Sequence, residues 1–173
     1  MFRSGGWPRL AAALSLCLLG ACGTPVERML PGSAPIEVTE VRRLVSCNSD
    51  GPQTRLYLLA DNNAVWAWEH SRKVDLIGVD PLPTAGAYVL VEMGVQQGGG
   101  YGLAISRRAQ IDNGLVITLS ASLLTPDSGQ GAAPAATSPC VLVALPQGTY
   151  HGVDLRDPSG NLLGRADAAA AVQ

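Results

Sequence analysis

Residues 101–124, YGLAISRRAQIDNGLVITLSASLL, decide the fold class, because two apolar and partly β-branched runs flank a tight-turn signal. The signal is Asp112-Asn113-Gly114, whose residues tolerate positive φ and are typical of short hairpin connections. We therefore predict two antiparallel strands, over residues 101–111 and 115–124.

Shorter apolar runs on both sides of this hairpin predict further strands, over residues 36–47, 55–60, 87–93, 140–145, 149–155 and 162–164. Asp61 is a suitable N-cap for a helix over about residues 62–72, in which Val65 and Trp68 would share a buried face. A period of two would instead group Trp66 with Trp68, as in a strand. We expect an α+β domain, predominantly an antiparallel β sandwich or partly open barrel, with one short helix.

The N-terminus resembles a bacterial lipoprotein signal. Arg3 and Arg9 precede a short apolar stretch over residues 10–19, and Leu19-Gly20-Ala21-Cys22 matches a lipobox. We predict a signal peptide over residues 1–21 and lipidation of Cys22; an ordinary cleaved signal is the alternative. Gly23, where inner-membrane lipoproteins usually carry aspartate, favours the outer membrane facing the periplasm.

The remaining chain is predicted to be one domain. Residues 22–35 are rich in proline and glycine and indicate a tether, residues 36–165 the β-rich domain, and residues 166–173 a disordered tail. Loss of Arg3 and Arg9 moves the formal charge from −2 to −4, and no basic cluster remains, so nucleic acid is excluded as a partner. No later apolar stretch is long enough to span a membrane.

The chain shows no motif that indicates an enzyme or a cofactor. Its two histidines, His70 and His151, have no metal-ligand spacing, and no nucleophile motif is present, so we expect neither catalysis nor a metal site. Cys17 leaves with the signal, which leaves Cys47 and Cys140 as a pair. In an oxidising envelope they are expected to form a disulfide; two separate buried thiols are the alternative.

The order of short motifs resembles the PrcB C-terminal-domain family of small bacterial lipoproteins, which is named for an accessory subunit of a surface protease complex. The resemblance covers roughly residues 56–146. Its markers are the tryptophan-bearing helix, Val74-Asp75-Leu76, Gly99-Gly100-Tyr101, Ile105, Pro126 with Gly129, and Thr137-Ser138-Pro139. Two positions depart from the family pattern: Gly98 replaces a threonine, and Cys140 replaces an aromatic residue after Thr-Ser-Pro. The resemblance implies a role in the envelope beside a protease.

Two loops are the candidate partner-binding surfaces. The first, residues 96–101, holds Gly98, Gly99, Gly100 and Tyr101, and the second, residues 125–139, holds Pro126. The first is either a recognition loop or a bulged hairpin whose tyrosine packs inward. It also resembles the glycine-containing turn of chagasin-like protease inhibitors.

Trp68 is expected in the core, while the sequence does not predict whether Trp66 is buried or exposed. We expect a membrane-anchored protein that binds another envelope or secreted protein; a protease-inhibitor module and a passive structural lipoprotein are the alternatives.

Overall fold

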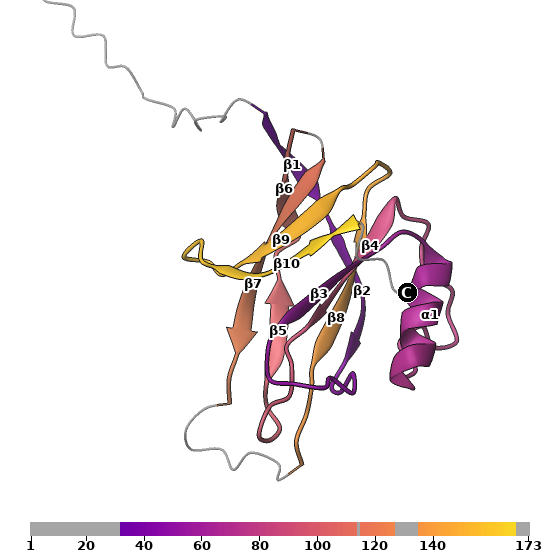
Figure 1. The fold of residues 1–173 in the computed structure, drawn as a ribbon, viewed down its shortest axis with the longest axis vertical. Coiled ribbons are helices and arrows are strands. Elements are labelled where there is room, and N and C mark those ends of the chain that lie inside the picture. The colour runs from indigo at the N-terminus through magenta and orange to yellow at the C-terminus, as the bar shows by residue number, and fades with distance from the viewer. Residues whose placement is uncertain (1–31, 114, 127–134, 169–173) are drawn as a thin grey trace, which may run out of the picture.

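Two β-sheets pack face to face, and a single helix covers the outer face of one of them (Figure 1). The computed structural model describes residues 32–113, 115–126 and 135–168. Its elements, in chain order, are β1 (Ser33–Glu37), β2 (Thr39–Leu44), β3 (Arg55–Leu59), α1 (Asn62–Arg72), β4 (Ala87–Glu92), β5 (Gly102–Ile105), β6 (Arg108–Asp112), β7 (Val116–Leu124), β8 (Cys140–Leu145), β9 (Gly152–Arg156) and β10 (Leu162–Asp167).

The sheets are mostly antiparallel, and the predicted α+β sandwich is confirmed. Sheet A has the strand order β1-β6-β7-β9-β10, with β5 added beside β7, and sheet B has the order β2-β8-β4-β3. They do not join into a closed barrel. No helix in the described part of the chain is long and apolar enough to cross a membrane.

Strands reach past residues 36 and 165, the expected ends of the β-rich domain. β1 begins at Ser33, within the segment assigned to the tether, and β10 continues to Asp167, within the segment assigned to the tail. Pro35 did not prevent strand formation because β1 is an edge strand, where a missing N–H leaves no ladder bond unmade. Ala166 is buried in the core, which explains why β10 continues past Arg165.

Two segments that were each predicted as one strand are divided in the structure. Residues 36–47 change from sheet A to sheet B at Val38, which is buried and donates its N–H to the carbonyl of Arg107 at 2.9 Å. Residues 101–111 are interrupted at Ser106 and Arg107, between β5 and β6. At Val38 the chain passes from one packed sheet to the other and must bend, and periodicity alone does not reveal that bend. β5 and β6 both pair with β7, so the second break is a local irregularity within sheet A.

The central hairpin is confirmed, but one strand pair was not foreseen. β6 and β7 pair antiparallel, with Gln110 opposite Thr118, and Asn113 has φ 50°; Gly114 lies outside the described residues. β7 and β9 pair parallel, with Thr118 opposite Asp154. This arrangement is possible because the chain between them crosses to sheet B as β8.

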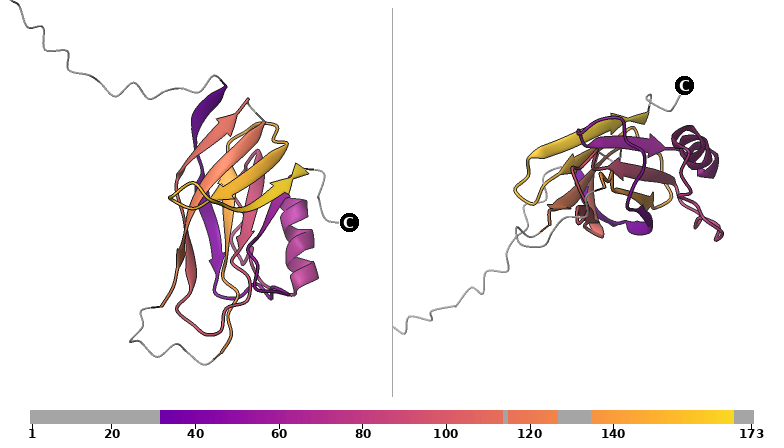
Figure 2. Two further views of the ribbon diagram at one scale, coloured as in Figure 1. Left: turned by 60° about the vertical axis from the view of Figure 1, so that its left-hand side comes forward. Right: turned by 90° about the horizontal axis from the view of Figure 1, so that it is seen from below.

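The core has two layers. One lies between the sheets, and the second lies between sheet B and α1 with the segment that follows it. Figure 2 shows the helix beside the two sheets in both views. The helix is confirmed over residues 62–72, and the Asp61 carboxylate accepts a hydrogen bond from the Ala64 N–H at 2.8 Å. Val65 and Trp68 are buried as predicted, whereas Trp66 is 58% exposed and stacks on His70.

Candidate functional site

The glycine turn, residues 96–101, lies at the end of the sandwich where β4 leads into β5 (Figure 1). We call this turn, together with Pro126 and Thr137, the glycine-turn rim. Gly100 has φ 86°, and a Cβ placed on it would lie 2.9 Å from the Cβ of Pro126. Only glycine fits there without strain, because real Cβ atoms do not approach so closely and L-residues disfavour this φ. The rim thus brings together two candidates that are distant in sequence.

Thr137 fixes the conformation of the turn. Its backbone exchanges two hydrogen bonds with Gln96, at 2.7 and 3.1 Å, and its hydroxyl donates to the carbonyl of Gly98 at 2.7 Å. The turn is therefore held by three hydrogen bonds from one residue of the Thr-Ser-Pro motif.

The next two residues of that motif fasten the neighbouring segments. The Ser138 hydroxyl oxygen accepts hydrogen bonds from the backbone N–H groups of Cys47 at 3.0 Å and Ser49 at 3.3 Å. The carbonyl of Pro139 accepts from the N–H of Met93 at 2.8 Å. Thr137-Ser138-Pro139 therefore acts as a clamp that joins the glycine turn, the residues after β2 and the end of β4.

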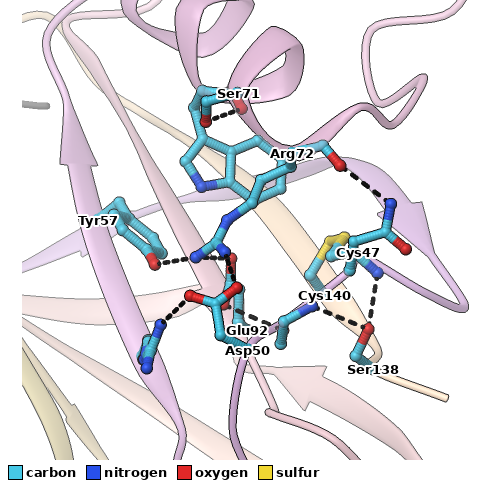
Figure 3. Close-up of polar contacts among 12 residues, drawn as sticks. Cys47, Asp50, Tyr57, Ser71, Arg72, Glu92, Ser138 and Cys140 are labelled. Carbon is cyan, nitrogen blue, oxygen red and sulfur yellow. Dashed lines mark hydrogen bonds and ion pairs between the residues drawn. A yellow bond between two sulfur atoms is a disulfide. The ribbon is translucent and has the colours of Figure 1, made fainter. Parts of the chain in front are cut away.

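The Cys47–Cys140 disulfide is confirmed and lies directly beside this clamp (Figure 3). Both cysteines are fully buried, and they lie 93 positions apart in sequence. The bond ties the segment after β2 to the first residue of β8. The alternative of two separate thiols is thereby excluded.

A group of charges, from the buried Glu92 to the exposed Asp50, lies beside the disulfide and under the helix (Figure 3). Glu92 is fully buried in β4, and its carboxylate lies 3.3 Å from the guanidinium of Arg72 and accepts a hydrogen bond from Ser49 at 3.0 Å. Arg72 also pairs with Asp50 at 2.6 Å and donates to the Tyr57 hydroxyl at 2.7 Å. The cluster joins the last turn of α1 to sheet B.

The pKa values of the two carboxylates in this cluster shift in opposite directions. Burial raises the pKa of Glu92, and the opposing attraction of Arg72 is smaller. Asp50 lies at the surface, where a hydrogen bond from Arg55 and the charge of Arg72 lower its pKa. Sequence reasoning missed this cluster. Its one available signal was Glu92 itself, a carboxylate in an otherwise apolar strand, which requires a nearby cation.

The other predicted site residues are not brought together in one place. Tyr101 is half-buried against the core between the sheets, as the bulged-hairpin interpretation requires. Trp66 lies on α1, and His151 lies just before β9. Cys22 and residues 127–134 of the second loop lie outside the described residues.

A groove of about 680 Å³ crosses the outer face of sheet A and contains no rim residue. Two of its charged side chains are already engaged by the protein. Asp157 accepts hydrogen bonds from its own turn, at the N–H of Ser159 and Asn161, and Arg156 donates to the Gly160 carbonyl and to Asp154. Among the described residues, no group of three or more potential ligands could hold a metal ion.

Comparison with known proteins supports the family resemblance. Residues 87–146, from β4 to the residue after β8, match the PrcB C-terminal family, and this segment includes the rim, the clamp and Cys140. The matched family is not a catalytic one. No curated protein and no solved structure matches the chain.

Proposed function

Because residues 87–146 match the PrcB C-terminal family, we propose that this chain is a lipid-anchored envelope protein that binds another envelope or secreted protein, as an accessory subunit of a protease complex. The lipid would be carried by Cys22, and the anchor would lie in the outer membrane.

The observation that carries the proposal is the preformed geometry of the glycine-turn rim. Thr137 holds the turn with three hydrogen bonds, and Gly100 packs against Pro126. A loop that is already ordered loses little conformational entropy when a partner binds, so more of the contact energy appears as affinity. Residues 96–101 carry no carboxylate, imidazole or thiol, and their one ionisable side chain is the Tyr101 phenol, a composition that suits recognition.

The direction in which the chain enters the domain also supports the proposal. β1 begins at the end of the long axis that carries the β6–β7 connection, and the glycine turn lies at the opposite end (Figure 1). A tether from a lipidated Cys22 would therefore leave the rim pointing away from the membrane. Confinement to one surface would raise the effective concentration of a partner held there.

The experiment is a crosslinked capture of the tagged full-length protein from its native membranes, followed by mass spectrometry of stoichiometric partners. Gln97→Arg places a charge at an exposed rim position, and Gln147→Arg places the same charge at an exposed position beyond the other end of β8. We expect one dominant exported protein that is lost with Gln97→Arg and retained with Gln147→Arg.

Three outcomes would contradict parts of the proposal. A partner that persists in Gln97→Arg would remove the rim as its contact surface, and the absence of any stoichiometric partner would favour a passive structural lipoprotein. If Cys22→Ser still fractionates with membranes, the lipid anchor is wrong. Inhibition of a captured cysteine protease by this chain would instead favour the chagasin-like interpretation.

A further inference from the structure

The edges of the two sheets differ in how well they are protected. β1 contains Pro35, which cannot donate a ladder hydrogen bond. β3 and β10 lie against each other, since a Cβ on Gly164 would lie 2.6 Å from Leu56. β5 follows the glycine turn directly, and β7 is the one strand that pairs with it among the residues that the structure describes.

One side of β5 has backbone groups directed away from its sheet. Leu103 lies opposite Leu123 in the ladder, and the Ser106 N–H donates to the Ser120 carbonyl at 2.8 Å. Backbone groups alternate in direction along an antiparallel strand, so Gly102, Ala104 and Ser106 face β7. The N–H and C=O groups of Leu103 and Ile105 therefore face the opposite side, toward β2.

One of these backbone groups is hydrogen-bonded to a side chain and not to a neighbouring strand. Arg43, which follows the bulge in β2, donates from Nη1 to the Leu103 carbonyl at 2.6 Å. Its other guanidinium nitrogens, Nε and Nη2, hold the Glu40 carboxylate at 2.9 and 2.8 Å. This contact joins the two sheets at their open side through an exposed arginine, an interaction of small net strength in water.

A cavity of about 330 Å³ opens beside this edge, lined by Val38, Glu40, Ile105, Ser106, Arg107 and Val143. Its apolar wall includes Val38 and Val143, both buried in the core. Arg107 is exposed and makes no ion pair with any residue that the structure describes. The cavity has room for one side chain. Of its two charged residues, Glu40 is already paired with Arg43, so Arg107 is the charge that favours a carboxylate.

We propose that an extended segment of the partner protein adds as a strand to the free edge of β5. The backbone of this segment forms hydrogen bonds with the N–H and C=O groups of Leu103 and Ile105, and it displaces Arg43 from the Leu103 carbonyl. One acidic side chain of the segment points toward Arg107. Strand addition of this kind obtains affinity from backbone hydrogen bonds and specificity from pockets that receive alternate side chains. The inference rests on the proposed function and names the chemistry of the partner.

The test is a screen of randomised ten-residue peptides against the full-length protein. Enriched peptides are expected to alternate β-branched residues and to share one acidic position. Two sets of peptides, N-methylated at the odd-numbered or at the even-numbered amides, are then compared with the unmodified protein. One set is expected to lose about tenfold or more in affinity, because its amides face β5, and the other set is expected to lose little. Binding through side chains alone would show no such alternation.

Protein variants locate the edge. Ile105→Pro removes the N–H that faces away from β7 and leaves the β5–β7 ladder bonds in place, and Ile105→Val is its matched control. We expect Ile105→Pro, but not Ile105→Val, to lose peptide binding, with thermal melting confirming that both variants fold. Arg107→Gln should weaken acidic peptides and have little effect on their Glu→Gln counterparts.

Several results would overturn the inference. The screen could enrich no peptides, or the two N-methylated sets could bind equally well. Binding could also be lost only in Leu123→Pro, which alters the outer edge of β7. If the capture experiment finds a partner that Ile105→Pro retains, strand addition fails while the proposed function stands. If capture finds no partner yet the two N-methylated sets differ as expected, the edge is real and the proposed function fails.

Discussion

Glu92 is the most deeply buried charged residue among those that the structure describes. It is fully buried, it faces a guanidinium at 3.3 Å, and one of its oxygens, Oε1, has no hydrogen-bond partner within the described residues. Removing a carboxylate from water costs several kcal/mol unless it is paired and hydrogen-bonded. Burial accordingly raises its pKa above the unfolded value of about 4.3.

This raised pKa predicts how stability changes with pH. Between the unfolded and the folded pKa, the folded protein binds more protons at Glu92 than the unfolded chain does, so the contribution of this residue to the free energy of unfolding falls as pH rises. Glu92→Gln should remove that part of the slope. Urea denaturation across the acidic-to-neutral range measures it.

Asp50 is expected to give the opposite dependence of stability on pH and serves as a control for Glu92. Its lowered pKa, caused first by the hydrogen bond from Arg55, means that its contribution is present above about pH 3.9 and is lost as pH falls through its folded pKa. Asp50→Asn should therefore remove a loss of stability in acid. An unchanged pH profile in Glu92→Gln would show that the buried carboxylate is compensated in some other way.

For single residues, features that depend on sequence neighbours were predicted, whereas contacts between distant segments were not. The N-cap at Asp61 and the apolar face of Val65 and Trp68 follow from a few neighbouring residues, and the structure confirms them. The pairing of Glu92 with Arg72 depends on how α1 docks on sheet B, which no short-range pattern describes.

At the scale of elements, the glycine-turn rim offers a matched comparison. Gly100 and Gly160 have nearly the same φ, 86° and 87°, but only Gly100 has a neighbour, Pro126, where a Cβ would lie. Each alanine variant should lose about 1 kcal/mol of unfolding free energy because of the positive φ. Gly100→Ala should lose a further 1 to 2 kcal/mol, roughly the cost of overpacking.

Urea denaturation of the two variants measures this difference. If both lose the same amount, the approach to Pro126 is not a constraint and the second loop can move aside. Restoration of Gly100→Ala by Pro126→Gly would identify the contact as the cause.

The strands show where sequence prediction succeeded and where it failed. Most of the predicted runs became strands, because apolar periodicity and turn residues act locally. The break at Val38 and the parallel β7–β9 pair were missed, because each depends on a segment of the other sheet. The break between β5 and β6 was also missed. The clamp role of Thr137-Ser138-Pro139 was missed for the same reason, although its residues were noted.

For the whole molecule, the Cys47–Cys140 bond is the principal covalent constraint. It joins residues 93 apart, and a closed loop of that length is worth about 4.6 kcal/mol in the chain-entropy estimate. The double variant Cys47→Ala, Cys140→Ala should therefore lose about 4 to 5 kcal/mol of unfolding free energy, seen as a lower thermal midpoint.

The control is the oxidised protein treated with reductant without denaturant. Both cysteines are buried, so reduction should be slow until the protein opens. A midpoint for the double variant that equals that of the oxidised protein would show that the bond contributes no stability.

The division of one chain segment between both sheets at Val38 has a mechanical consequence. A pull between the N-terminus and the glycine-turn rim acts along β1 and β2, so it loads their ladder bonds to β6 and β8 together in shear, where bonds resist jointly. If β1 and β2 were pulled out of their sheets, extension of the chain would stop at Cys47. Its disulfide to Cys140 would pass the force to β8, the strand that follows the clamp. The domain is thus built to transmit force along its long axis while its rim keeps its shape.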